Sequence, residues 1–192
     1  TEVALRAASR AALNGKQVAL LAPTTVLADQ HYETFKSRLW QRGFFVERLT
    51  RLESKTKSRE IFEKLREGKI DILIGTHKIL SKDLEFRNPG LLIIDEEQRF
   101  GVSHKEALKK KYPAIDILYL SATPIPRTLA FSLSKIRPLS LISEPPAGRI
   151  PIMTFVLPRN RKIISEALKE ELSRGGQIYF LSSRISKIPF IS

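Results

Sequence analysis

The sequence predicts an α/β fold in which helices flank a parallel sheet, and three observations carry this prediction. Short apolar runs alternate with helical patterns through the first three quarters of the 192 residues, which is the pattern of βα units. Several of these runs are apolar throughout, as strands covered on both faces should be. The chain is also 42% hydrophobic and 28% charged, a balance typical of folded globular proteins.

Predicted strands and helices alternate along this part of the chain. The predicted strands are 17–22, 44–50, 70–76, 91–95, 117–121 and 139–142. Residues 26–40 and 58–67 are predicted helices, because each carries an amphipathic stripe at helical spacing. The stripe positions are Leu27, His31, Phe35 and Leu39 in the first helix and Ile61, Phe62 and Leu65 in the second. Both helices are expected to pack on the sheet.

A change in composition predicts a domain boundary in the last quarter of the chain. Residues 144–151 contain three prolines and a glycine, which disfavour regular structure and suit a linker. The elements predicted beyond them are a strand at 152–157, a helix at 161–174 and a strand at 177–181. We therefore expect one α/β lobe over 1–143, a linker over 144–151 and the beginning of a second α/β lobe over 152–192.

The charge balance favours a polyanionic partner. The chain has 33 Lys and Arg against 20 Asp and Glu, a net charge of +13, and basic side chains that neutralise phosphates release condensed counterions. A solvated basic surface is the alternative. The chain has no Cys, which excludes thiol chemistry and disulfides.

The sequence gives no sign of a membrane or secretory role. Its first residues lack the layout of a signal peptide, and no apolar run approaches the ~20 residues that span a bilayer. We expect a cytoplasmic protein with no membrane partner.

Two carboxylates at the end of the fourth predicted strand are the strongest candidates for catalysis. Asp95 and Glu96 follow the apolar run 91–94, and the carboxyl edge of a parallel sheet is where ligands bind in open α/β folds. Asp95 is predicted to hold Mg²⁺ through its waters, and Glu96 to deprotonate the water that attacks a γ-phosphate. An acidic helix start, favoured by the helix dipole, is the alternative.

Small hydroxyl residues follow the next predicted strand. Ser121-Ala122-Thr123 precedes two prolines, Pro124 and Pro126, which gives a stiff corner able to contact both a neighbouring site and a groove. Ordinary helix capping is the alternative for this segment alone. Because this segment lies one predicted strand after Asp95, the two segments together are a more specific sequence signal than this segment alone.

Four segments, in this order, resemble the motifs of superfamily 2 helicases and translocases. They are Ala22-Pro23-Thr24-Thr25 with Leu27 and Gln30 (motif Ia), Ile74-Gly75-Thr76-His77, Asp95-Glu96-Glu97-Gln98 (motif II) and Ser121-Ala122-Thr123 (motif III). The resemblance covers most of residues 18–128. It implies a RecA-like parallel sheet as a first motor lobe, the start of a second RecA-like lobe, and ATP with Mg²⁺ as cofactors.

Longer stretches are similar to the bacterial transcription-repair coupling factors. These stretches are 23–32, 75–78, 99–102 and 122–129. The RecG branch-migration helicases share the last two and are the alternative, but they usually carry Glu at the position of Thr25. The resemblance implies an ATP-driven translocase on double-stranded DNA that displaces stalled RNA polymerase and recruits excision-repair proteins.

The resemblance also implies a role for each matching residue. The residues that would contact the DNA backbone are Pro23, Thr24, Thr25, Gln30, Thr76, His77 and Arg127. Those that would couple nucleotide state to DNA grip are Ser121, Ala122 and Thr123. Gln98 would contact the nucleotide site and transmit changes between that site and the residues that couple nucleotide state to DNA grip.

Each of these roles has a structural alternative. Thr24 and Thr25 could cap the helix that follows them, and Gln98 could cap a helix as well. His77 could be a satisfied core histidine. A zinc site of His31, His77 and His104 has no support from spacing or from cysteine.

The resemblance predicts that parts of the site lie outside this sequence. We expect Thr1 to be the last residue of a truncated phosphate loop, and so an ATP contact and a second Mg²⁺ ligand. The arginine-bearing motifs are expected beyond Ser192. We therefore expect a fragment that hydrolyses no ATP alone, taken from an ATP-hydrolysing parent. A non-catalytic DNA-binding or scaffold module is the alternative from another class.

Overall fold

The computed structural model describes residues 1–100, 112–121, 138–144, 148, 152–158 and 160–181. The chain divides into two compact units, Thr1–Pro138 and Leu139–Ser192. Within the described residues, no helix is both long enough and apolar enough to cross a membrane.

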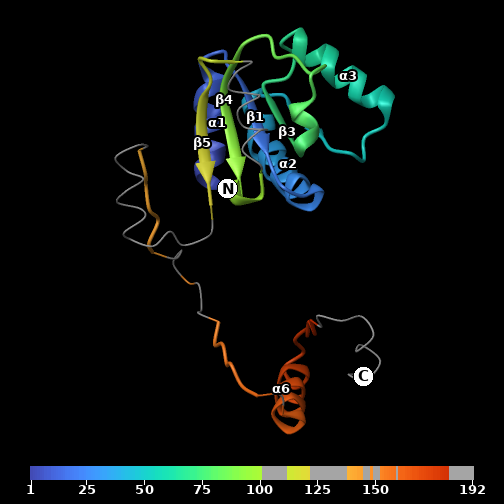
Figure 1. The fold of residues 1–192 in the computed structure, drawn as a ribbon, viewed down its shortest axis with the longest axis vertical. Helices are drawn as coiled ribbons and strands as arrows, with labels where there is room; N and C mark the ends of the chain where they lie inside the picture. The colour runs from blue at the N-terminus through green and yellow to red at the C-terminus, as the bar shows by residue number, and fades with distance from the viewer. Residues whose placement is uncertain (101–111, 122–137, 145–147, 149–151, 159, 182–192) are drawn as a thin grey trace. The chain divides into compact units, whose positions relative to one another are not determined.

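The first unit is built on a five-stranded parallel sheet (Figure 1). Its strands are β1 (Gln17–Leu21), β2 (Val46–Leu49), β3 (Ile72–Gly75), β4 (Pro89–Asp95) and β5 (Asp116–Leu120). They lie in the order β2-β3-β1-β4-β5, so that β1 is central and pairs with both β3 and β4. The predicted α/β fold with a parallel sheet is confirmed, and five of the predicted strands form it.

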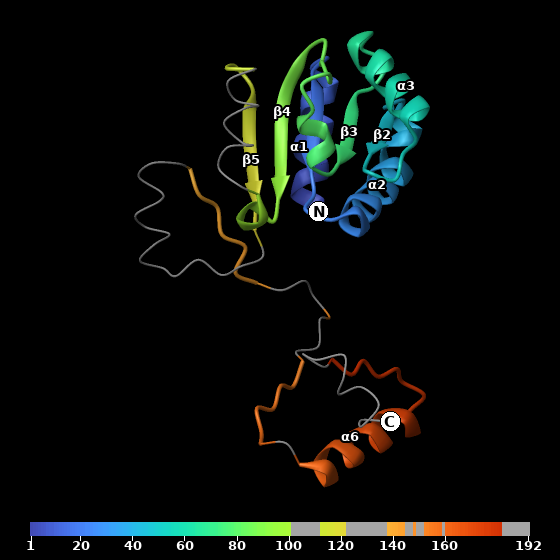
Figure 2. The ribbon, with the colours of Figure 1, turned by 45° about the vertical axis from the view of Figure 1, so that its right-hand side comes forward.

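The register of the strands aligns their carboxyl ends along one edge of the sheet. Leu21 of β1 lies opposite Gly75 of β3 and Ile94 of β4, and Asp95 lies opposite Leu120 of β5. The arrowheads of the strands point to this edge in Figure 2, and the N-terminus lies beside it. Residues that directly follow each strand therefore gather at this carboxyl edge.

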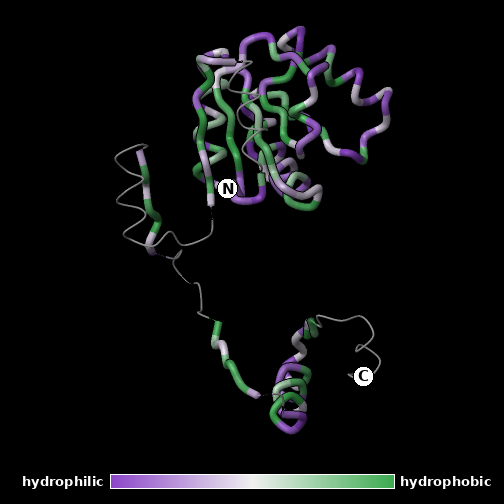
Figure 3. The backbone as a smooth tube through the Cα atoms, viewed as in Figure 1, coloured by the Kyte–Doolittle hydropathy of each residue, from purple (hydrophilic) through white to green (hydrophobic). Residues whose placement is uncertain are grey.

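Among the described residues, three helices cover the two faces of the sheet: α1 (Glu2–Leu13), α2 (Thr25–Leu39) and α3 (Lys55–Arg66). One buried cluster joins α1 and α2 to alternate residues of the strands, including Val18, Leu20, Ile72, Ile74 and Ile93. The residues between them, including Ala19, Leu21, Leu73, Leu92 and Ile94, pack with α3 on the other face. Figure 3 shows the apolar sheet between more hydrophilic helices.

Local sequence signals set the ends of these helices. The Thr24 hydroxyl accepts a hydrogen bond from the Leu27 N–H at the start of α2, and Ser54 caps α3 through the Lys57 N–H. Such caps contribute about 1 kcal/mol each. After α2, the short 3-10 helix η1 (Trp40–Arg42) ends at Gly43, whose φ of 79° is the left-handed region that glycine adopts without a steric penalty.

The buried stripe of α2 differs slightly from the predicted one. Ala28, His31, Phe35 and Leu39 are buried, whereas Leu27 is only partly buried. The stripe therefore includes a polar side chain, His31, that an apolar core cannot accommodate without a hydrogen-bond partner.

Three predicted strands are absent from the described structure. The three segments are 139–142, 152–157 and 177–181. Within the described structure they are not paired as strands, and their residues are exposed. A strand needs a neighbour for its backbone N–H and C=O groups, and apolar composition alone does not supply one. The predicted helix is present as α6 (Arg161–Ser173), capped by Asn160, with no buried side chain.

Candidate functional site

The carboxyl edge of the sheet gathers most of the residues predicted to carry function. The start of α2 follows β1, the short 3-10 helix η2 (His77–Leu80) follows β3, and η3 (Glu97–Arg99) follows β4. β1 lies between β3 and β4. The described residues that are predicted to contact DNA, which follow β1 and β3, therefore occupy one half of this edge, and the predicted catalytic residues after β4 occupy the other half.

Asp95 ends β4 with both carboxylate oxygens engaged. Its Oδ2 lies 2.7 Å from Nε2 of His31, and its Oδ1 accepts the Glu96 N–H at 3.0 Å. The hydrogen bond with His31 is the main cause that lowers the pKa of Asp95, and burial opposes it. Asp95 is therefore held as a carboxylate, the form that binds a divalent cation.

His31 is the residue of this site that sequence reasoning missed. It stands in the buried stripe of α2, its side chain is 2% exposed, and its ring meets Phe35 edge-on at 6.3 Å. Its second ring nitrogen, Nδ1, is buried with no hydrogen-bond partner in the part of the chain that the structure describes. The available signal was a histidine in an otherwise apolar stripe, which requires a polar partner.

Glu96 directly follows β4 and has an unusual backbone. Its φ is 53°, the single positive value at a residue other than glycine among the described residues. A left-handed conformation at such a residue costs about 1 to 2 kcal/mol. The partly buried Glu96 follows the last residue of β4, and its backbone N–H donates to the carboxylate of Asp95.

Gln98 links Glu96 to the end of β5. Its Nε2 donates a hydrogen bond to Oε2 of Glu96, and its Oε1 accepts one from the Ser121 hydroxyl at 3.3 Å. Gln98 therefore lies between the predicted base and the first residue of the predicted coupling segment. The other two residues of that segment, Ala122 and Thr123, lie outside the described residues, as does Arg127.

The predicted DNA contacts at the start of α2 lie at the surface. Thr24 and Gln30 are exposed, and Pro23 and Thr25 are partly buried. The capping alternative for Thr24 is present in the structure, but it uses a lone pair of the hydroxyl oxygen and leaves the O–H free to donate. Capping and a phosphate contact are therefore compatible at this residue.

The two residues after β3 are placed differently from each other. His77 is exposed, so the alternative of a satisfied core histidine is wrong. Thr76 is 3% exposed, and its Oγ1 has no hydrogen-bond partner within the described residues. A contact between the Thr76 hydroxyl and DNA would therefore require this segment to open.

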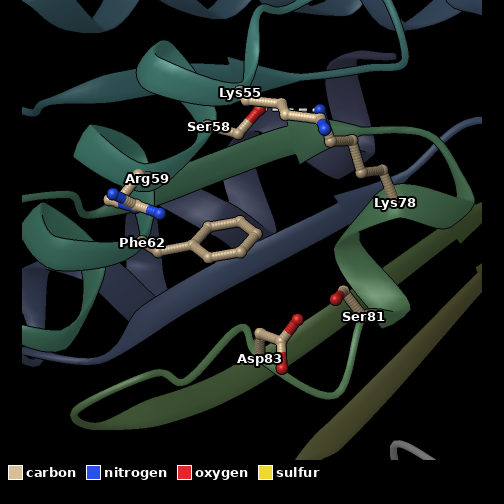
Figure 4. A pocket seen from close by; sticks show the side chains of 7 residues that line it. All are labelled: Lys55, Ser58, Arg59, Phe62, Lys78, Ser81 and Asp83. Carbon is tan, nitrogen blue, oxygen red and sulfur yellow. Dashed lines mark hydrogen bonds between the residues drawn. The ribbon is translucent and has the colours of Figure 1, made fainter.

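A basic pocket lies next to His77, between α3 and the segment that follows β3 (Figure 4). Its lining residues are Lys55, Ser58, Arg59, Phe62, Lys78, Ser81 and Asp83. Lys78 donates to the Ser58 hydroxyl at 2.7 Å. Within the described structure, the side chains of Lys55 and Arg59 have no ion-pair partner. Lys78 forms no ion pair with a described residue either, and Asp83 is the one carboxylate among the lining residues, so the pocket is positively charged overall.

An ion-pair network holds the loop that leads into α3. Arg48 bonds Asp29 of α2 at 2.7 Å and Glu53 at 3.0 Å, and Glu53 also accepts from the N–H and hydroxyl of Thr50. Burial acts to raise the pKa of Glu53, but the hydrogen bonds from Thr50 and Arg48 outweigh it and lower the pKa. This network fixes α2 relative to the start of α3.

The donor set at the edge suits Mg²⁺ bound together with a phosphorylated ligand. Asp95 supplies one carboxylate, and Thr1, exposed at the start of α1, supplies a hydroxyl. The described residues contain no cluster of three or more metal-binding side chains. Mg²⁺ is typically held in this way, by few carboxylates plus waters and phosphates.

Comparisons with known proteins show the family and the fold of the chain. The model of the DEAD/DEAH box helicase family matches residues 1–131. The transcription-repair-coupling factors of Bacillus subtilis and Haemophilus influenzae are 50% and 52% identical to the chain over 188 residues, which is 98% of the chain. The chain spans 16% of the length of each of these relatives.

A solved structure of RecG bound to a three-way DNA junction is similar to the chain in fold and sequence. It has a TM-score of 0.74 and 34% identity, and the match covers 92% of this chain and 24% of the RecG chain. The RecA-like nature of the sheet is therefore confirmed.

Proposed function

Since this chain belongs to the DEAD/DEAH box helicase family, we propose that it is the first ATPase lobe of an ATP-driven translocase on double-stranded DNA. The translocase would displace stalled RNA polymerase and couple transcription to nucleotide excision repair in the cytoplasm. The observation that carries this proposal is the 50% identity to a transcription-repair-coupling factor over nearly the whole chain. The residues at the carboxyl edge support this proposal, because they include carboxylates suited to Mg²⁺ and water and exposed polar groups suited to phosphates.

The catalytic half of the edge suits ATP hydrolysis. Asp95 and Thr1 would hold Mg²⁺ with ATP, next to the N-terminus of α1, where backbone N–H groups favour phosphates. Bound Mg²⁺ would neutralise charge on the phosphates. Glu96 would accept a proton from the attacking water, and the hydrogen bond that its carboxylate accepts from Gln98 would help to orient it.

The other half of the edge suits the backbone of a DNA duplex. Thr24, Gln30 and His77 expose hydrogen-bonding groups there, and Pro23 and Thr25 lie in the same corner. Lys55 and Arg59 add positive charge in the basic pocket, which also includes Lys78, the residue after His77. Contacts of this kind grip phosphates without reading sequence, as a motor that moves along any DNA requires.

Gln98 connects the two activities in this proposal. It contacts the predicted base Glu96 and the Ser121 hydroxyl, and Ser121 opens the segment that continues to Ala122, Thr123 and Arg127. A change at the nucleotide would thus reach the DNA contacts through one side chain. RNA polymerase and excision-repair proteins would bind through other parts of the full-length protein.

RecG-type branch migration is the second candidate, because the chain resembles RecG in fold. The identity to RecG is 34%, lower than the 50% identity to the B. subtilis coupling factor. The two functions differ in substrate, since one acts on duplex DNA beside a stalled polymerase and the other on branched DNA.

The test uses the full-length protein that carries this sequence. We expect linear duplex DNA to stimulate its ATP hydrolysis, and we expect it to release RNA polymerase stalled on a template in the presence of ATP. Release with ATP but not with a non-hydrolysable analogue supports the proposal. Regression of a branched fork without polymerase release would select the RecG-type function, and the absence of DNA-stimulated hydrolysis would reject both.

A further inference from the structure

The one buried histidine of α2 bonds the carboxylate that is proposed to hold Mg²⁺. His31 and Asp95 are 64 residues apart in sequence and come from α2 and β4, and their side chains meet at 2.7 Å. The His31 side chain is 2% exposed and that of Asp95 19% exposed. The histidine is therefore shielded from solvent, whereas the carboxylate is partly accessible to it.

A packing role alone does not explain a histidine at this position. Its neighbours in the stripe, Ala28 and Phe35, are apolar and fully buried. The buried Nδ1 of His31 has no partner within the described part of the chain, and an unsatisfied buried polar group costs about 1 to 3 kcal/mol. Leucine would fill the same stripe without that cost. The hydrogen bond between Nε2 of His31 and Asp95 is therefore the feature that explains a histidine at this position.

The contact also joins the two halves of the carboxyl edge. His31 lies seven residues after Thr24, the cap of α2, which corresponds to roughly 10 Å along a rigid helix. The start of α2 is a proposed DNA contact, and Asp95 is the proposed metal residue. A shift of α2 when its start engages a phosphate would therefore move the hydrogen-bond donor on Asp95.

We propose that His31 is a positioning residue that fixes the Asp95 carboxylate for Mg²⁺ and transmits duplex binding at the start of α2 to the metal site. Hydrogen bonds from neighbouring side chains orient the groups that bind a metal, and their removal typically weakens metal binding about 10- to 100-fold. The part of this proposal that concerns duplex binding rests on the proposed function. The part that concerns Mg²⁺ requires only that the protein bind a nucleotide.

The test measures Mn²⁺ affinity by electron paramagnetic resonance in the full-length protein with a non-hydrolysable ATP analogue. His31→Leu keeps the volume and removes the hydrogen bond, His31→Gln keeps a donor, and Phe35→Leu controls for packing one turn later on α2. We expect Mn²⁺ affinity to fall about tenfold or more in His31→Leu, to recover at least partly in His31→Gln, and to stay unchanged in Phe35→Leu.

The second half of the test adds duplex DNA. We expect duplex to change the Mn²⁺ affinity of the wild type and of His31→Gln but not that of His31→Leu, because coupling between two sites disappears when their link is removed. Wild-type Mn²⁺ affinity in His31→Leu, or an equal loss in Phe35→Leu, would overturn the positioning role. A duplex effect of full size in His31→Leu, or none in a wild type that binds duplex, would overturn the coupling.

The two proposals fail in different ways. If the wild type binds no duplex, the proposed function fails, while the Mn²⁺ comparison without DNA still decides whether His31 positions Asp95.

Discussion

The Ser121 hydroxyl donates a hydrogen bond to Oε1 of Gln98 over 3.3 Å, which joins the end of β5 to the segment that follows β4. Gln98 in turn donates to Glu96. One amide side chain therefore contacts both the proposed base and the start of the proposed coupling segment, although Gln98 and Ser121 are 23 residues apart in sequence.

Replacing Gln98 is expected to separate DNA binding from ATP turnover. Gln98→Ala removes both hydrogen bonds, and the loss of a hydrogen bond to a charged group, about 1.5 kcal/mol or more, corresponds to roughly tenfold in rate. We expect duplex stimulation of ATP hydrolysis to fall by about that factor, while nucleotide affinity changes little. Steady-state hydrolysis with and without duplex measures this, with exposed Gln41→Ala in η1 as the control. Unchanged stimulation in Gln98→Ala would remove Gln98 from the coupling route.

Replacing Glu96 is expected to abolish turnover and to preserve nucleotide binding. Glu96→Gln keeps the size of the side chain but cannot accept the proton of the attacking water, and general-base catalysis is typically worth about 10²- to 10⁴-fold. Single-turnover hydrolysis and equilibrium nucleotide binding in the full-length protein measure the two effects. Glu63→Gln, an exposed carboxylate change on α3, is the control. Parental turnover in Glu96→Gln would assign the base to another residue.

Removing two of the cations of the basic pocket, Lys55 and Arg59, is expected to weaken DNA binding in a salt-dependent way. When a basic side chain that neutralises one phosphate is replaced, the slope of log affinity against log salt falls by about 0.9. We expect the double variant Lys55→Gln with Arg59→Gln to lower this salt slope by up to roughly 1.8. Fluorescence anisotropy with a labelled duplex over a series of salt concentrations measures the slope.

A matched control for this pair lies at the other end of α3. Arg66 ends the helix, Lys69 follows it before β3, and both are exposed and ion-paired. Arg66→Gln with Lys69→Gln removes the same charge far from the carboxyl edge. The pocket has no role in DNA binding if the two double variants change the salt slope equally.

Glu53 is expected to make the stability of the chain depend on pH. Its pKa is lowered in the folded state, so its charged form stabilises the fold above the ordinary pKa of Glu, about 4.3. This contribution disappears as the pH falls through the lower folded-state pKa. We expect the urea midpoint of the wild type to exceed that of Glu53→Gln at pH 6 and the difference to shrink toward pH 3. A difference that does not depend on pH would contradict the charge-based role.

Much of the fold was determined by the sequence itself, because its signals are local. Apolar runs and amphipathic stripes predicted the five strands of the sheet and the helices α2, α3 and α6. Since a parallel sheet brings the ends of its strands to one edge, the sequence also placed Asp95 and Ser121, which end successive predicted strands, at the same edge. The strand ends were less well predicted: β2 and β3 are shorter than the predicted strands 44–50 and 70–76.

Tertiary structure alone decided which partner each polar side chain has. The order β2-β3-β1-β4-β5 places β1 beside β4, and α2, which follows β1, thereby brings His31 to Asp95. The same packing buries Thr76 and exposes His77, although they are neighbours in sequence. It also leaves residues 139–142 unpaired despite their apolar character. Such contacts depend on which strands become neighbours, and no local pattern encodes that choice, whereas periodicity and capping act within a few residues and can be read from the chain directly.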